Sequence, residues 1–169
     1  MEALSYKMDL RLGRDAVWER FTSGPGLCSW LCQRATFEAV VGGRVDLEWD
    51  VAPGRGGTLT EVRGRVLSID RPRLLTFSWL GAVRGVFCST GETEVMLDLF
   101  PTPEGTRVEL SHLGWSGGDA SLAERDRVDR LWWSALERLR AAVRLSPRAS
   151  VMSTVMVRGA AGSLSRRSR

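Results

Sequence analysis

The sequence has 169 residues, of which 43% are hydrophobic and 26% charged, with a formal net charge of +4. This length forms one domain with a single core, and this composition excludes disordered, collagen-like and membrane-embedded proteins. The N-terminus lacks a basic and apolar leader and no apolar run reaches 18 residues, so we expect a cytoplasmic protein. Cys28, Cys32 and Cys88 are an odd number of cysteines, which predicts free thiols.

The positive charge is concentrated at the C-terminal end. Residues 146–169 contain five arginines and no acidic residue, so the first 145 residues hold 19 basic and 20 acidic side chains. We therefore divide the chain into a folded domain, residues 1–145, and a basic Ser/Arg/Gly-rich tail, residues 146–169. Because the tail has no aromatics between its arginines, nucleic acid ranks last among the expected partners. Its apolar stretch, residues 151–157, is expected to dock on its own domain rather than on a second chain.

The first elements predicted along the chain are a strand and two short helices. Residues 6–12 alternate between apolar and polar, the period of a half-buried strand. Val17 and Phe21 are one helical turn apart and predict a helix over residues 15–21. Residues 24–26 (Gly-Pro-Gly) are expected to break it, and the spacing of Leu27, Trp30 and Leu31 predicts a second short helix.

A series of strands and one long helix follow. Turn residues separate six predicted strands, which short connections make antiparallel: residues 34–40, 44–50, 58–69, 74–80, 93–100 and 106–113. The long helix, residues 121–145, opens with Ser121 and Glu124 in capping-box spacing. Its apolar stripe consists of Val128, Trp132, Leu136, Leu139 and Val143. One apolar sheet face and one apolar helix stripe predict an α+β fold, a curved antiparallel sheet whose concave face is covered by the helix.

His112 is the one titratable residue that we single out for chemistry. It is the only histidine and shares its inward strand parity with Val108 and Leu110. It is either a core histidine or, if the protein is an enzyme, a general base. Nucleophile and phosphate-loop motifs are absent, and Cys28 and Cys32 lack metal-ligand spacing, so we expect neither an enzyme nor a cofactor nor a metal site.

The aromatic residues favour a binding site. The chain has seven tryptophans, and several aromatic side chains fall on inward positions of the predicted strands and helix. They form either the core or the wall of a cavity between sheet and helix. The predicted ligand-binding residues are Trp49, Phe77, Trp79, His112, Trp132 and Leu136.

Five stretches of the sequence carry a family resemblance. They are residues 15–22 (DAVWERFT) followed by Trp30, 37–44 (FEAVVGGR), 66–79 (VLSIDRPRLLTFSW), 105–115 (GTRVELSHLGW) and 133–139 (WSALERL). In this order and spacing they resemble the activator of heat shock protein 90 ATPase homologue family of the SRPBCC or START-like superfamily, over residues 4–145. The resemblance implies the Bet v 1-like helix-grip fold, but fold determinants transfer function poorly.

Three functions remain open. The leading one is non-catalytic binding of an apolar or aromatic small molecule between the sheet and the long helix. The resemblance implies an alternative, a protein-interaction domain that activates a chaperone ATPase. A cyclase or aromatase type of START-like enzyme using His112 is the third. The expected partners are therefore a hydrophobic small molecule, with a chaperone or a second copy of the chain as the protein contact, and no membrane.

Overall fold

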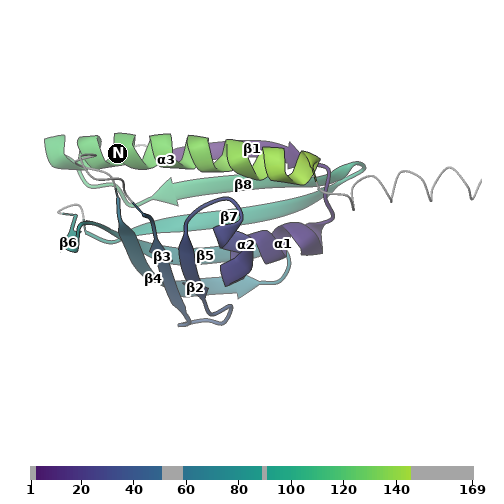
Figure 1. The fold of residues 1–169 in the computed structure, drawn as a ribbon, viewed down its shortest axis with the longest axis horizontal. Helices are drawn as coiled ribbons and strands as arrows, with labels where there is room; N and C mark the ends of the chain where they lie inside the picture. Colours follow the sequence, from purple (N-terminus) through teal and green to yellow (C-terminus); the bar gives the residue numbers. More distant parts are fainter. Residues whose placement is uncertain (1–2, 51–58, 89–90, 146–169) are drawn as a thin grey trace, which may run out of the picture.

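The computed structural model describes residues 3–50, 59–88 and 91–145. The predictions for the tail, including its apolar stretch, lie outside these residues. Two short helices follow the first strand, and a long helix follows the remaining strands (Figure 1). The elements are β1 (Leu4–Leu10), α1 (Arg14–Thr22), α2 (Gly24–Cys28), β2 (Arg34–Phe37), β3 (Arg44–Glu48), β4 (Glu61–Asp70), β5 (Leu74–Val83), β6 (Val86–Phe87), β7 (Thr93–Thr102), β8 (Gly105–Leu113) and α3 (Asp119–Arg144).

The strands form one curved antiparallel sheet in the order β1-β8-β7-β5-β4-β3-β2, with β6 paired to the end of β5. β4 carries an irregularity between Val66 and Ser68, where its register with β5 shifts, and such bulges bend a strand and increase its twist. Gly42 has the positive φ of 79° that the predicted turn before β3 needs. The α+β prediction is confirmed.

α3 lies along the sheet and presents one face to it (Figure 1). Its apolar buried residues recur at helical spacing and include the whole predicted stripe: Val128, Trp132, Ala135, Leu136, Leu139 and Val143. These side chains and the inward residues of the strands form a single core with α1 and α2. The space between sheet and helix is therefore where the tryptophans meet.

The second short helix differs from its prediction. The first helix does end at Thr22, just before the predicted break. Residues 24–26 are not the break itself but the first turn of α2, because the Ser23 hydroxyl accepts a hydrogen bond from the Gly26 backbone N–H at 3.0 Å. Pro25 stands in that first turn, where its missing N–H costs no helical hydrogen bond. Trp30 and Leu31 follow the helix and are still buried, at 2% exposure each.

The start of α3 also differs from its prediction. The helix begins at Asp119, and its N-cap is Gly118, which makes no side-chain cap hydrogen bond. Ser121 and Glu124 are therefore not a capping box. Both lie inside the helix on its buried face, at 3% and 5% exposure. They extend the buried stripe by two polar positions toward the N-terminal end of the helix.

Two further observations complete the fold. β6 is a two-residue strand that the sequence pattern did not predict, and β5 runs three residues beyond its predicted end. Among the described helices, none has the length and apolar character needed to cross a membrane.

Candidate functional site

His112 lies in the centre of the core, fully buried, with both ring nitrogens engaged. Thr93 Oγ1 donates to the Trp79 carbonyl at 3.1 Å and lies 2.7 Å from His112 Nε2, so it accepts the Nε2 proton. The Trp132 indole N–H donates to His112 Nδ1 at 3.1 Å. The ring is therefore a neutral imidazole that donates through one nitrogen and accepts through the other.

Burial also fixes the charge of this histidine. Burial lowers the pKa of His112 from 6.5 to about 3, because removal from solvent disfavours the charged imidazolium. A general base needs a pKa near the working pH and a free nitrogen within reach of the substrate. His112 has neither in this arrangement, so its contacts are those of a core residue that joins β8 to β7 and α3.

A chain of aromatic rings runs through the interior. Trp132 on α3 lies between Trp79 of β5 and Trp30, with ring centroids 5.3 and 6.5 Å away. Trp49 continues the chain beyond Trp79 at 6.2 Å, and its indole N–H donates to the Leu31 carbonyl at 2.7 Å. Tilted contacts of this kind stabilise aromatic pairs. The rings belong to the packed core between the sheet and α3.

The interior also contains polar atoms without partners. Trp79 Nε1 and Ser121 Oγ are buried and have no hydrogen-bond partner among the described residues. Gly81 on β5 lies beside the indole: a Cβ there would lie 3.6 Å from Trp79 Nε1 and 3.3 Å from Glu124 Oε1. Its only contact closer than 3 Å would be the side chain of Leu59, at 2.8 Å. A buried indole donor and hydroxyl therefore stand at the N-terminal half of α3, and Glu124 is the neighbouring acid.

The structure brings together some of the predicted ligand-binding residues. Trp79, His112 and Trp132 are in mutual contact, and Trp49 packs on Trp79. Phe77, two residues before Trp79, instead makes an edge contact with Phe37. Leu136 lies on the buried face of α3, one helical turn after Trp132.

Ser121, Glu124 and Gly81 were not among the predicted site residues. The signal for the first two was present in the sequence, because their spacing from Val128 and Trp132 continues the helical stripe. Interpreting Ser121 and Glu124 as a capping box placed them at the start of the helix and left them out of the buried stripe. Nothing in the sequence distinguishes Gly81 from other strand glycines.

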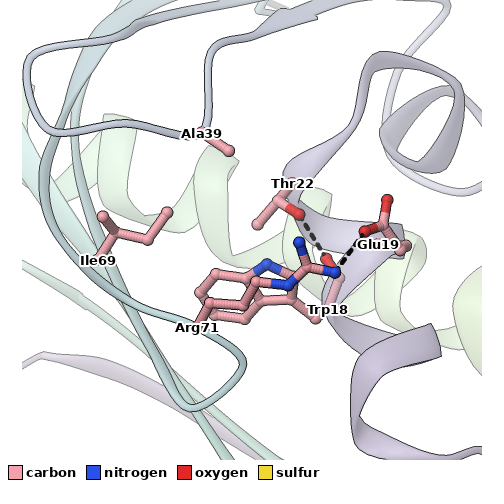
Figure 2. A pocket seen from close by; sticks show the side chains of 6 residues that line it. All are labelled: Trp18, Glu19, Thr22, Ala39, Ile69 and Arg71. Carbon is pink, nitrogen blue, oxygen red and sulfur yellow. Dashed lines mark hydrogen bonds and ion pairs between the residues drawn. The ribbon is translucent and has the colours of Figure 1, made fainter.

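A hollow lies next to α1, away from the buried tryptophan cluster (Figure 2). Its volume is about 370 Å³. Arg71 lies on its rim and forms an ion pair with Glu19 at 3.3 Å. None of the six predicted ligand-binding residues lines it; its lining is Trp18, Glu19, Thr22, Ala39, Ile69 and Arg71.

The cysteines are free thiols with suppressed reactivity where they are covered. Burial, together with the neighbouring Cys28, raises the pKa of Cys32 to about 12. Burial and a hydrogen bond to Glu124 raise the pKa of Cys88 to about 12. Thiolates are the reactive and metal-binding form, so these two are poor nucleophiles. In the described part of the chain, no group of three His, Cys, Asp or Glu side chains is placed to hold a metal ion.

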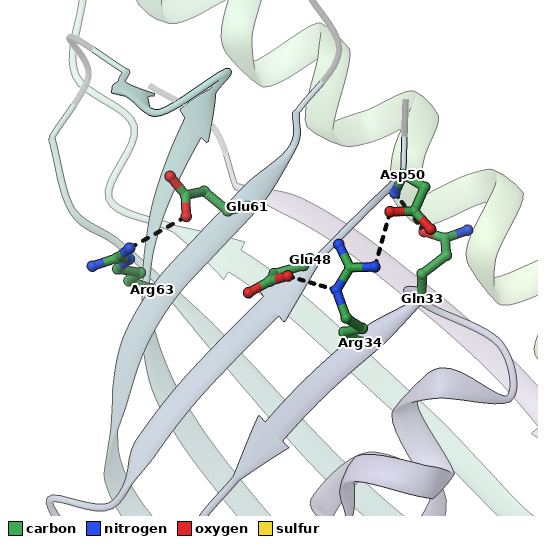
Figure 3. A network of polar contacts seen from close by, with 6 residues as sticks. All are labelled: Gln33, Arg34, Glu48, Asp50, Glu61 and Arg63. Carbon is green, nitrogen blue, oxygen red and sulfur yellow. Dashed lines mark hydrogen bonds and ion pairs between the residues drawn. The ribbon is translucent and has the colours of Figure 1, made fainter. Parts of the chain in front are cut away.

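The outer face of β2, β3 and β4 carries a network of ion pairs (Figure 3). Arg34 on β2 bonds to Glu48 at 2.7 Å and to Asp50 at 2.9 Å. Arg63 bonds to Glu61 on the same strand at 3.4 Å. Apart from the partly covered Glu61, these side chains are largely exposed, so they lie on the solvated face of the sheet and leave the interior to the aromatic residues.

Comparisons with known proteins agree on one family and one fold. The family model described as Activator of Hsp90 ATPase homolog 1-like protein matches residues 11–144. A crystal structure of a Mesorhizobium loti protein is similar with a TM-score of 0.66 and 19% identity, over 86% of this chain and 99% of that one. The solution structure of the Aha1 dimer from Colwellia psychrerythraea gives 0.64 and 17%, over 87% and 99%. A Rhodobacter sphaeroides crystal structure gives 0.66 and 24%, over 85% and 93%. No curated protein matches the sequence.

Proposed function

The chain belongs to the Activator of Hsp90 ATPase homolog 1-like family, and we propose that it binds an apolar or aromatic small molecule between the sheet and α3 without catalysing a reaction. The observation that carries the proposal is the unpartnered Trp79 indole N–H, buried at the polar end of an aromatic interior. A buried donor without a partner costs about 1–3 kcal/mol, and a ligand that supplies an acceptor recovers this cost.

The surroundings of this donor suit a flat, mainly apolar compound. Trp49 and Trp132 both pack against the Trp79 ring system. Ser121 Oγ offers a second polar atom from α3. Apolar walls with a few placed polar groups are the usual composition of ligand sites. The ligand would present a hydroxyl or carbonyl oxygen to Trp79 and its apolar body to the rings.

The environment of His112 supports binding rather than catalysis. Both of its nitrogens are held by Thr93 and Trp132, and burial keeps the ring neutral. A proton-transfer role would require breaking one of these bonds and raising the histidine pKa by several units.

Two measurements test the proposal. Native mass spectrometry of the protein purified from its own host should detect a copurifying small molecule. Titration with 2-naphthol and with naphthalene, which lacks the hydroxyl, should give about three- to tenfold tighter binding of 2-naphthol, the equivalent of one hydrogen bond. The indole N–H resonance of Trp79 should move during the 2-naphthol titration.

Matched variants identify the atoms involved. Trp79→Phe keeps a ring but removes the donor, so it should abolish the preference for 2-naphthol. Gly81→Ala should weaken both probes, because its methyl group would lie 2.8 Å from the Leu59 side chain and force a shift beside the Trp79 indole. Gly13→Ala is the control, since an added Cβ there meets nothing within 4 Å. Absence of a copurifying mass, together with probe affinities unchanged by Trp79→Phe and Gly81→Ala, would refute the site.

Family membership also supports a second function, activation of a chaperone ATPase. The test is the ATPase rate of Hsp90 from the same organism, measured with and without this protein. Stimulation that persists in Trp79→Phe would assign the activity to the surface rather than to the interior. An unchanged rate would reject this second function and leave the first intact.

A further inference from the structure

The β1 strand forms one edge of the sheet and is long enough to pair with another strand. It comes first in the strand order, contains seven residues, and bonds to β8 along its inner side. On its other side, no strand among the described residues pairs with it. An edge strand exposes backbone N–H and C=O groups that a second chain can bind by strand addition.

The charges on β1 are complementary to themselves in one antiparallel register. Lys7 and Asp9 are two residues apart on the outer face, with side-chain exposures of 62% and 64%. In an antiparallel pair centred on Met8, Lys7 of each copy lies opposite Asp9 of the other. Opposite charges directly across a strand pair are stabilising, and like charges are destabilising.

The neighbouring strand extends this pattern. Glu109 on β8 is opposite Lys7 and bonds to it at 2.7 Å, and Arg107 is opposite Asp9 and bonds to it at 2.9 Å. In the joined sheet, four side chains would lie side by side across four neighbouring strands. They are Glu109 and Lys7 of one copy, followed by Asp9 and Arg107 of the second copy. The signs alternate over four strands, so no like charges lie opposite each other in the row.

An exposed aromatic residue lies beside the same strand. Trp133 on α3 is 58% exposed and makes an edge contact with Tyr6 of β1 at 5.9 Å. Tyr6 is itself held to α3 by a 2.5 Å hydrogen bond to Asp129. Exposed tryptophan and tyrosine rings are common at the centres of protein interfaces. In a dimer whose two-fold axis passes through Met8, Tyr6 and Trp133 of one copy would lie close to the same two residues of the other copy.

The opposite edge of the sheet is less suitable. β2 has four residues against seven in β1, and it contains one cation, Arg34, but no acidic residue, so a second copy of β2 could not complement its charge. We propose that β1 pairs antiparallel with β1 of a second copy, centred on Met8, and joins the two sheets into one. This surface is separate from the interior ligand site.

The test is the dimer dissociation constant of the full chain, measured by analytical ultracentrifugation at low salt. We expect the wild type to dimerise. Lys7→Glu and Asp9→Lys each place like charges at two symmetric positions, so each should weaken the dimer by about tenfold or more. An equimolar mixture of the two variants should form a heterodimer at about the wild-type affinity. In this heterodimer the new carboxylate at position 7 faces the new amine at position 9, and the unchanged Asp9 faces the unchanged Lys7.

Two controls distinguish a loss of dimerisation from a loss of folding. Arg34→Glu, on the other edge, should leave the dissociation constant unchanged, and thermal melts should show each variant folded. A wild type that stays monomeric up to about 1 mM, the range of very weak complexes, would overturn the proposal. So would single variants that dimerise as well as the wild type, or a mixture that recovers no heterodimer.

Discussion

Protonation of His112 should make the stability of this protein fall between pH 7 and pH 5. The folded pKa is about 3 and the unfolded value is about 6.5, so below pH 6.5 the unfolded chain binds a proton that the folded chain does not. Stability is therefore lost as the pH falls from about 7 toward the folded pKa. At about 1.4 kcal/mol per pH unit below the unfolded pKa, the free energy of unfolding at pH 5 should be about 2 kcal/mol lower than at pH 7.

The composition of the chain makes this titration easy to isolate. His112 is the only histidine, and most carboxylates titrate below pH 5. Urea unfolding followed by tryptophan fluorescence at pH 7, 6 and 5 measures the free energy. His112→Gln should be less stable at pH 7 but nearly independent of pH over this range. A wild type whose stability is flat from pH 7 to pH 5, or parallel to that of His112→Gln, would show that the histidine titrates normally and is not buried neutral.

Three further predictions follow from the same structure. Leu136→Ala should lower the free energy of unfolding by about 2–5 kcal/mol, because Leu136 is 4% exposed on the buried face of α3; a loss below about 1 kcal/mol in urea unfolding would mean that the stripe is misassigned. Burial and the bond to Asp129 raise the pKa of Tyr6, the only tyrosine, so ultraviolet titration should detect no phenolate at about pH 10. Stability should then fall as the pH rises above 10, because only the unfolded tyrosine ionises, and a normal titration would refute the contact. Deletion of residues 146–169 should leave the domain folded with 19 basic and 20 acidic residues, a net charge of −1, and any weak binding to DNA should be lost with the tail; a gel-shift assay in which the truncated chain still binds would contradict this.

The strands could be predicted because each is indicated by a local pattern, the alternation of apolar and polar residues along the strand. Alternation fixes which residues of β7 and β8 face inward, and His112 was placed correctly by this rule. β6 was missed because two residues contain no period to detect. The first turn of α2 was missed because Gly-Pro-Gly is usually a break, and only the Ser23 cap reveals a helix.

The candidate site was predictable only in part. The aromatic residues were identified because inward parity and helical spacing select Trp79 and Trp132 directly. The polar end was not, since Ser121 and Glu124 fit two patterns at once, a capping box and the continuation of a stripe. The choice between them depends on where the helix begins, which is set by Gly118 and by tertiary packing. The surroundings of Gly81 are the side chains of Leu59, Trp79 and Glu124, which are far apart in the sequence and give no local signal.

The buried face of α3 is polar in its first turns and apolar after them, and this difference affects how a molecule would enter the interior. From Val128 onward the helix is fixed by aliphatic and aromatic side chains, whereas its first two turns bury Ser121 and Glu124 and start without a side-chain cap. Local unfolding free energy rises with buried apolar contact, so amide hydrogens in the first turns should exchange sooner than those after Trp132. The helix would then unfold locally, starting from its N-terminal end. Partial opening of this kind would uncover the Trp79 indole N–H beside Glu124 while Trp132 stays packed on the ring. The rate of ligand binding would then follow the frequency of this local unfolding rather than that of global unfolding.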